Sequence, residues 1–66
     1  MIQNDTELQV TLERIRRFQE QVAHLRHVET DAKNFRLSAS GFVAELDRMN
    51  LEVREYLLRY PMESKT

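Results

Sequence analysis

The chain has 66 residues, enough for one domain at most, and its eleven acidic and ten basic residues give a formal net charge of −1. This near balance provides no overall field that would attract nucleic acid or an anionic membrane. A core in a chain this small rarely supplies more than about 3–5 kcal/mol, and without cysteine no disulfide or thiolate metal site adds to it. We therefore expect association to supply part of the stability.

No stretch of the sequence approaches the ~18 consecutive apolar residues of a membrane span. Residues 1–5 also lack the basic and apolar regions of a signal peptide, so we expect a cytoplasmic protein without membrane contact. One glycine, one proline and 32% charged residues are typical of long helices. The sequence thus predicts a single all-α domain over residues 1–66, in which residues 61–66 form a flexible tail.

The first predicted helix covers residues 5–29. It begins after Asn4, an efficient N-cap that is followed by Glu7 in a capping-box spacing, with Thr6 as a competing N-cap. Apolar residues then recur every three or four positions, which is the pattern of one buried helix face: they are Leu8, Leu12, Ile15, Phe18, Val22, Leu25 and Val28. This pattern fails at Glu29, where we place the end, although a kinked helix that continues to about Asn34 is an open alternative.

The second predicted helix covers residues 38–60 and follows an ordered connection over residues 30–37. Ser38 is the expected N-cap, because it places Leu37 and Phe42 where they can form a hydrophobic staple. Apolar residues hold spacings of four and three for about three heptads, as in a coiled coil: they are Phe42, Leu46, Met49, Val53, Tyr56 and Tyr60.

Pro61 ends the second helix, because the residue before a proline is pushed out of the helical region. The two helices are of similar predicted length, so we expect an antiparallel two-helix hairpin. The residues expected to pack inside it are Ile15, Phe18, Val22, Leu25, Phe42, Leu46, Met49, Val53 and Tyr56.

A second apolar stripe runs along the second predicted helix. Ala44, Leu51 and Leu58 lie seven residues apart and point away from the packing seam, so a monomeric hairpin would leave them exposed. Single exposed leucines are common on protein surfaces, but burying one stabilises a protein by ~1.5–3 kcal/mol. We expect these residues at an oligomer or partner interface. Two hairpins that form a four-helix bundle are the simplest closed dimer, and a tetramer or a different protein partner is also possible.

Four polar residues in the first predicted helix are a candidate metal site. On a continuous helix Glu20, His24, His27 and Asp31 would share one broad face. Their spacing is neither that of the HExxH motif nor that of di-iron bundles. If the helix ends near Glu29, the histidines simply suit the negative end of its dipole. We predict no metal site and no cofactor.

The segment from Arg14 to Arg36 has six basic and three acidic residues. A dimer would double this excess, and Arg14, Arg17 and Arg26 are the candidate nucleic-acid contacts. The arginines are spread around the helix and acidic residues intervene, so a solvated helix surface explains them better. A nucleic-acid-binding helical bundle is therefore the alternative function, and nucleic acid is not the expected partner.

The sequence contains no catalytic motif. Ser38 and Ser40 are assigned to the turn, no signature links them to a histidine base, and no glycine-rich phosphate loop occurs. We expect a hairpin to offer no concave pocket of the ~300 Å³ or more that small-ligand sites use, unless oligomerisation creates one. The sequence thus favours a self-associating protein-interaction module that is not an enzyme.

Three segments carry a resemblance to known proteins: Ile2-Gln3-Asn4 with Glu7-Leu8, Leu37-Ser38-Ala39-Ser40-Gly41-Phe42, and Val53-Arg54-Glu55-Tyr56-Leu57 before Pro61. Together they resemble a family of short, uncharacterised bacterial proteins with a helical hairpin. Segments similar to the first and third also precede helix-turn-helix domains in some antitoxin-like regulators, a portion that this sequence lacks. The resemblance implies a bacterial source and a toxin–antitoxin or regulatory setting, with an antitoxin-like role as a further alternative. It supplies no catalytic residues.

Overall fold

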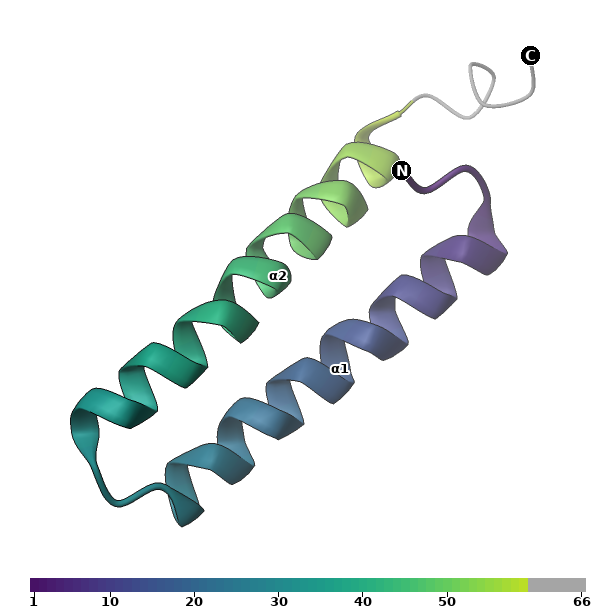
Figure 1. The fold of residues 1–66 in the computed structure, drawn as a ribbon. Coiled ribbons are helices and arrows are strands. Elements are labelled where there is room, and N and C mark those ends of the chain that lie inside the picture. Colours follow the sequence, from purple (N-terminus) through teal and green to yellow (C-terminus); the bar gives the residue numbers. More distant parts are fainter. Residues whose placement is uncertain (60–66) are drawn as a thin grey trace.

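The computed structural model describes residues 1–59. They form two helices, α1 (Asp5–Val28) and α2 (Ala32–Leu58), which lie antiparallel as a hairpin (Figure 1). The all-α hairpin predicted from the sequence is confirmed. Neither helix of the described part has the length and apolar character needed to cross a membrane. The predicted tail over residues 61–66 and the predicted seam residue Tyr60 lie outside the described residues.

The start of α1 is the one predicted from the sequence. Asn4 has an extended backbone, and its side-chain Oδ1 accepts a hydrogen bond from the backbone N–H of Glu7 at 2.8 Å. The Glu7 carboxylate in turn accepts from the backbone N–H of Gln3 at 2.7 Å, one residue before the position that a standard capping box uses. Thr6 lies within the first turn, so the competing start is wrong.

The end of α1 also lies close to the predicted position. The helix ends at Val28, and Glu29 is its C-cap. The connection to α2 consists of Glu29, Thr30 and Asp31, and the Glu29 side chain accepts a hydrogen bond from the Asp31 backbone N–H at 3.1 Å. The predicted break near Glu29 is confirmed, and the alternative of a helix continuing to Asn34 is wrong.

The start of α2 differs from the prediction. The helix begins at Ala32, well before Ser38, and Asp31 is the N-cap. Its carboxylate accepts hydrogen bonds from the backbone N–H groups of Lys33 and Asn34 at 2.8 and 3.2 Å. One carboxylate thus satisfies two amides that have no partner inside the helix, and its charge complements the helix dipole. The start predicted at Ser38 and the connection predicted over residues 30–37 are therefore wrong.

Serine and glycine are tolerated inside α2, which is why the predicted turn does not form. The Ser40 hydroxyl donates to the backbone oxygen of Leu37 at 2.9 Å, so it is satisfied within the helix. Gly41 does not have a positive φ, and it lies within the regular helix. The longer helix also leaves Phe35 half-buried and Ala39 buried, so packing of the added turns outweighs the local cap signal at Ser38.

The core lies along the seam between the helices. The rings of Phe18 and Phe42 meet edge to face, with centroids 5.7 Å apart and planes at 88°, a favourable aromatic geometry. Ile15 and Met49 are buried. The other predicted packing residues are half-buried: Phe18, Val22, Leu25, Phe42, Leu46, Val53 and Tyr56. The sequence thus identified the seam, although it missed the burial of Ala39.

Polar contacts join the two helices at the open end of the hairpin, where the N-terminal segment turns back from α1 towards α2 (Figure 1). The Tyr56 hydroxyl donates to the Asp5 carboxylate at 2.6 Å. The ammonium group of Met1 lies 3.3 Å from the Glu52 carboxylate. Ile2, the residue after Met1, is 3% exposed, a burial that the sequence pattern did not predict. The hydrogen bond to Asp5, followed by desolvation, raises the pKa of Tyr56 above its usual 10.0.

Candidate functional site

The predicted interface residues lie on the face of α2 that is turned away from the seam. Met49, which belongs to the seam, is 4% exposed, whereas Leu51 is 54% and Leu58 is 76% exposed. Ala44 is also exposed. Residues seven apart are separated by about two helical turns and occupy nearly the same side of a helix. The three side chains therefore form one apolar stripe.

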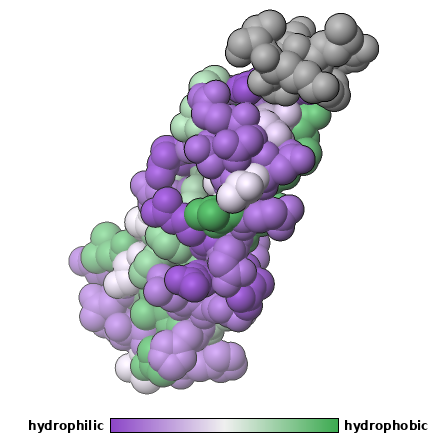
Figure 2. Space-filling model, turned by 90° about the vertical axis from the view of Figure 1, so that its right-hand side faces the viewer, coloured by the Kyte–Doolittle hydropathy of each residue, from purple (hydrophilic) through white to green (hydrophobic). Residues whose placement is uncertain are grey.

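The structure adds a fourth member to this stripe. Because α2 begins at Ala32, Leu37 is helical and lies seven residues before Ala44, and it is 66% exposed. Leu37 was not among the predicted interface residues, because the predicted connection over residues 30–37 included it. We call Leu37, Ala44, Leu51 and Leu58 the α2 stripe. Figure 2 views the side of the molecule where α1 lies in Figure 1, and that surface is mostly hydrophilic with separate hydrophobic patches.

Charged residues flank the α2 stripe on both sides. On one side, Arg48 donates to the carboxylates of Glu45 and Glu52 at 2.6 and 2.9 Å. The hydrogen bond to Arg48 lowers the pKa of Glu45, and the same contact raises the pKa of Arg48. On the other side, neither Asp47 nor Arg54 makes an ion pair with any residue of the described range 1–59.

The three candidate nucleic-acid contacts do not converge on one surface. Arg26 follows Arg17 by nine residues, or two and a half helical turns, which places the two on opposite sides of α1. Arg17 lies 3.5 Å from the Glu13 carboxylate, so acidic groups stand beside the arginines. The charge of Arg14 helps to lower the pKa of Glu45 on α2. The nine-residue spacing of Arg17 and Arg26 in the sequence already indicates that they lie on opposite sides of a helix.

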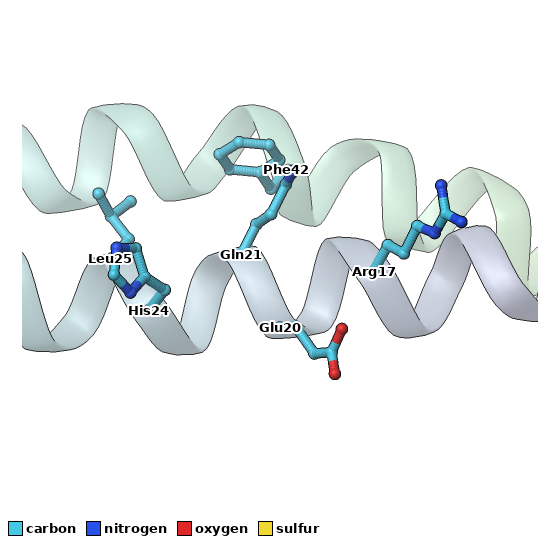
Figure 3. A pocket seen from close by; sticks show the side chains of 6 residues that line it. All are labelled: Arg17, Glu20, Gln21, His24, Leu25 and Phe42. Atoms are coloured by element: carbon cyan, nitrogen blue, oxygen red, sulfur yellow. The ribbon is translucent and has the colours of Figure 1, made fainter.

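A depression of about 460 Å³ lies on the surface next to the middle of the seam. Its presence means that the expectation of no pocket above ~300 Å³ was wrong. Figure 3 shows the Phe42 ring on α2, the Gln21 side chain extending from α1 towards it, and the Glu20 carboxylate pointing away from α2. The residues that line the depression are Arg17, Glu20, Gln21, His24, Leu25 and Phe42. It is open to solvent, and the side chains of Arg17, Glu20 and His24 point in different directions.

The candidate metal ligands are divided by the break between the helices. Glu20, His24 and His27 lie on α1, whereas Asp31 caps α2 with its carboxylate. No group of three or more His, Cys, Asp or Glu side chains in the described part of the chain is placed to hold a metal ion.

The described residues therefore define an all-α helical hairpin with an exposed apolar stripe on its second helix. Comparisons with protein-family models, with curated proteins and with solved structures found no match.

Proposed function

We propose that this chain is a self-associating protein-interaction module without catalytic activity of its own. The observation that carries the proposal is the α2 stripe, whose leucines are exposed although they repeat with the regularity of a coiled-coil seam. The proposed occupant is a second copy, which gives an assembly of four helices, and pairs of dimers would give a tetramer. The proposed setting is the bacterial cytoplasm, which rests on the sequence alone.

The small core of the hairpin supports association. Among the described residues only Ile2, Ile15, Ala39 and Met49 are buried apolar residues. A domain this small gains little stability from a single core. Burying further apolar surface by association would therefore raise its free energy of unfolding by a large fraction. Covering Leu51 and Leu58 in each copy would contribute ~1.5–3 kcal/mol per leucine before the costs of association.

The proposal predicts that changing Leu51 and Leu58 together to glutamate abolishes association. Light scattering coupled to size exclusion, over a hundredfold range of protein concentration, should show an oligomer for the natural chain that dissociates on dilution. The double variant should be monomeric at every concentration, because burying two carboxylates without partners opposes the contact.

Val10→Glu is the matched control, because Val10 is 56% exposed but lies on α1, away from the α2 stripe. This variant should associate as the natural chain does. A natural chain that stays monomeric at the highest concentration, or a double variant with unchanged association, contradicts the proposal.

The alternatives rest on less. A nucleic-acid-binding bundle requires Arg14, Arg17 and Arg26 to act together, and no such arrangement supports it. An antitoxin-like regulatory role rests only on the sequence resemblance. If the chain is a folded monomer, a different protein becomes the expected occupant of the α2 stripe.

A further inference from the structure

Four charged residues surround Leu51, and on each side of the α2 stripe a residue before Leu51 has the opposite charge to the residue after it. Asp47 lies four positions before Leu51 and Arg54 three positions after it, which places both on one side of the α2 stripe. Arg48 and Glu55 hold the corresponding positions on the other side. At these positions each side therefore has one acidic residue four positions from Leu51 and, in the opposite direction along the helix, one basic residue three positions from it.

Asp47 and Arg54 have no partner within the described hairpin. Neither makes an ion pair within residues 1–59. Neither has a charged residue three or four positions away, where a helix would supply a partner. Both therefore keep their hydrogen-bonding groups available beside the exposed leucines.

We propose that a second copy of the chain docks on the α2 stripe in antiparallel orientation, with the two-fold axis at Leu51. This inference rests on the proposed self-association and specifies its geometry. An antiparallel pair keeps each side of the stripe against the same side of the other copy but reverses its direction. Asp47 then faces Arg54 of the second copy, and Arg48 faces Glu55 of the second copy, and the symmetry repeats each pair.

The sizes of the side chains select this orientation. In a parallel pair, Asp47 would face Arg48 of the second copy, so charge alone does not exclude it. A parallel pair would also set Ala44 against Ala44 beside a Leu51 layer that holds the helices ~8–10 Å apart, which leaves a gap. In the antiparallel pair Leu58, the most exposed leucine of the stripe, lies against Ala44 of the second copy. Large and small residues then interdigitate.

The arrangement fixes the shape of the assembly. The α2 stripe points away from α1, so the two α2 helices lie in the centre and the two α1 helices lie outside them. The four helices form a layer, which differs from the closed four-helix bundle expected from the sequence. Leu37 lies outside the helix–helix contact, because the position that faces it is seven residues beyond Leu58, where α2 ends.

Charge exchange tests the orientation. D47R and R54D each place like charges opposite one another twice, so each should weaken the dimer about tenfold at low ionic strength. The double variant D47R/R54D restores opposite charges in the antiparallel pair, as does an equimolar mixture of the two single variants. Dimer dissociation constants from sedimentation or light scattering should therefore return towards the natural value in both cases.

A parallel pair gives the reverse result, because the double variant would set arginine 47 against Arg48 and the new aspartate at position 54 against Glu55. A dimer weaker in the double variant than in either single variant therefore overturns the antiparallel orientation. Circular dichroism checks that each variant is helical, which is expected because both positions are exposed and unpaired within the described hairpin.

Leu37→Glu is the matched control for register. Leu37 is as exposed as the other stripe leucines, yet it lies outside the antiparallel contact, so this variant should dimerise like the natural chain. Loss of the dimer in Leu37→Glu overturns the register centred on Leu51 while leaving self-association intact. A natural chain that is monomeric at all concentrations overturns the self-association on which the register rests.

Discussion

Asp31 decides where the second helix begins, because its carboxylate accepts hydrogen bonds from the amides of Lys33 and Asn34. Asp31→Ala removes both bonds and should lower the free energy of unfolding by about 1 kcal/mol, within the ~0.5–2 kcal/mol found for N-cap losses. Urea unfolding followed by circular dichroism measures this change.

Ser38→Ala is the matched control, since Ser38 is the N-cap that the sequence suggested and the structure places inside α2. This variant should be neutral or slightly stabilising, because alanine has the higher helix propensity. A larger loss for Ser38→Ala than for Asp31→Ala would show that the helix begins at the later position in solution.

The caps show how far local sequence reasoning reaches at single residues. At Asn4 the cap signal and the apolar pattern begin together, so the prediction was confirmed. At the start of α2 two cap signals compete, Asp31 and Ser38, and their local chemistry is similar. The burial of Ala39 and the half-burial of Phe35 favour the earlier start, and burial depends on the position of α1, which local spacing does not supply.

Gly41 lowers the stability of α2, and no close packing inside the hairpin requires a glycine at this position. Glycine costs about 1 kcal/mol relative to alanine in a helix interior. A Cβ placed on Gly41 would have no neighbouring atom within 4 Å, so the added methyl group meets no obstacle. Gly41→Ala should therefore raise the free energy of unfolding by about 1 kcal/mol, measured by urea or thermal unfolding.

The dimer dissociation constant of Gly41→Ala should be unchanged, because Gly41 lies outside the antiparallel contact centred on Leu51. Unfolding at a fixed, low protein concentration separates helix stability from association. A destabilised Gly41→Ala variant would mean that another group packs closely on this position.

The helices themselves were predictable to different degrees. In α1 and in the second half of α2 the apolar residues recur at three and four positions, and the structure packs most of them into one seam. Leu12 and Val28 of the predicted α1 face are exposed instead. The same periodicity identified Leu51 and Leu58 as exposed, although Leu37 was missed with the start of α2. The flanking charges of the stripe were readable from the sequence. That Asp47 and Arg54 make no ion pair within the described hairpin became known only from the structure, which places the other ion pairs.

At the scale of the whole molecule, exposed hydrogen bonds link stability to pH. Hydrogen bonds to Arg16 and Arg48 lower the pKa values of Glu13 and Glu45 below their usual 4.5. On acidification the unfolded chain takes up these protons first, so their stabilisation is complete above about pH 4.5 and is lost as the pH falls through the folded pKa values. The pKa of Tyr56 is raised, so its stabilisation is complete below pH 10.0 and is lost as the pH rises through the folded value.

We therefore expect the melting temperature to have a plateau between these limits and to fall on both sides. Thermal unfolding at low ionic strength measures it, because salt weakens exposed charge pairs. The double variant Glu13→Gln with Glu45→Gln should show a shallower fall in acid, and Tyr56→Phe a shallower fall in alkali. Limbs of unchanged slope in these variants would remove the three groups as the cause.

The connection of Glu29, Thr30 and Asp31 also determines the order in which the chain can close. Residues that meet near it are close in sequence, and the separation grows steadily to the pair of Asp5 and Tyr56 at the open end. Each added turn of contact therefore extends a loop that is already closed, at a small further loss of chain entropy. Such a topology of mostly local contacts belongs with the fast-folding helical proteins, since no step requires a search for a distant segment.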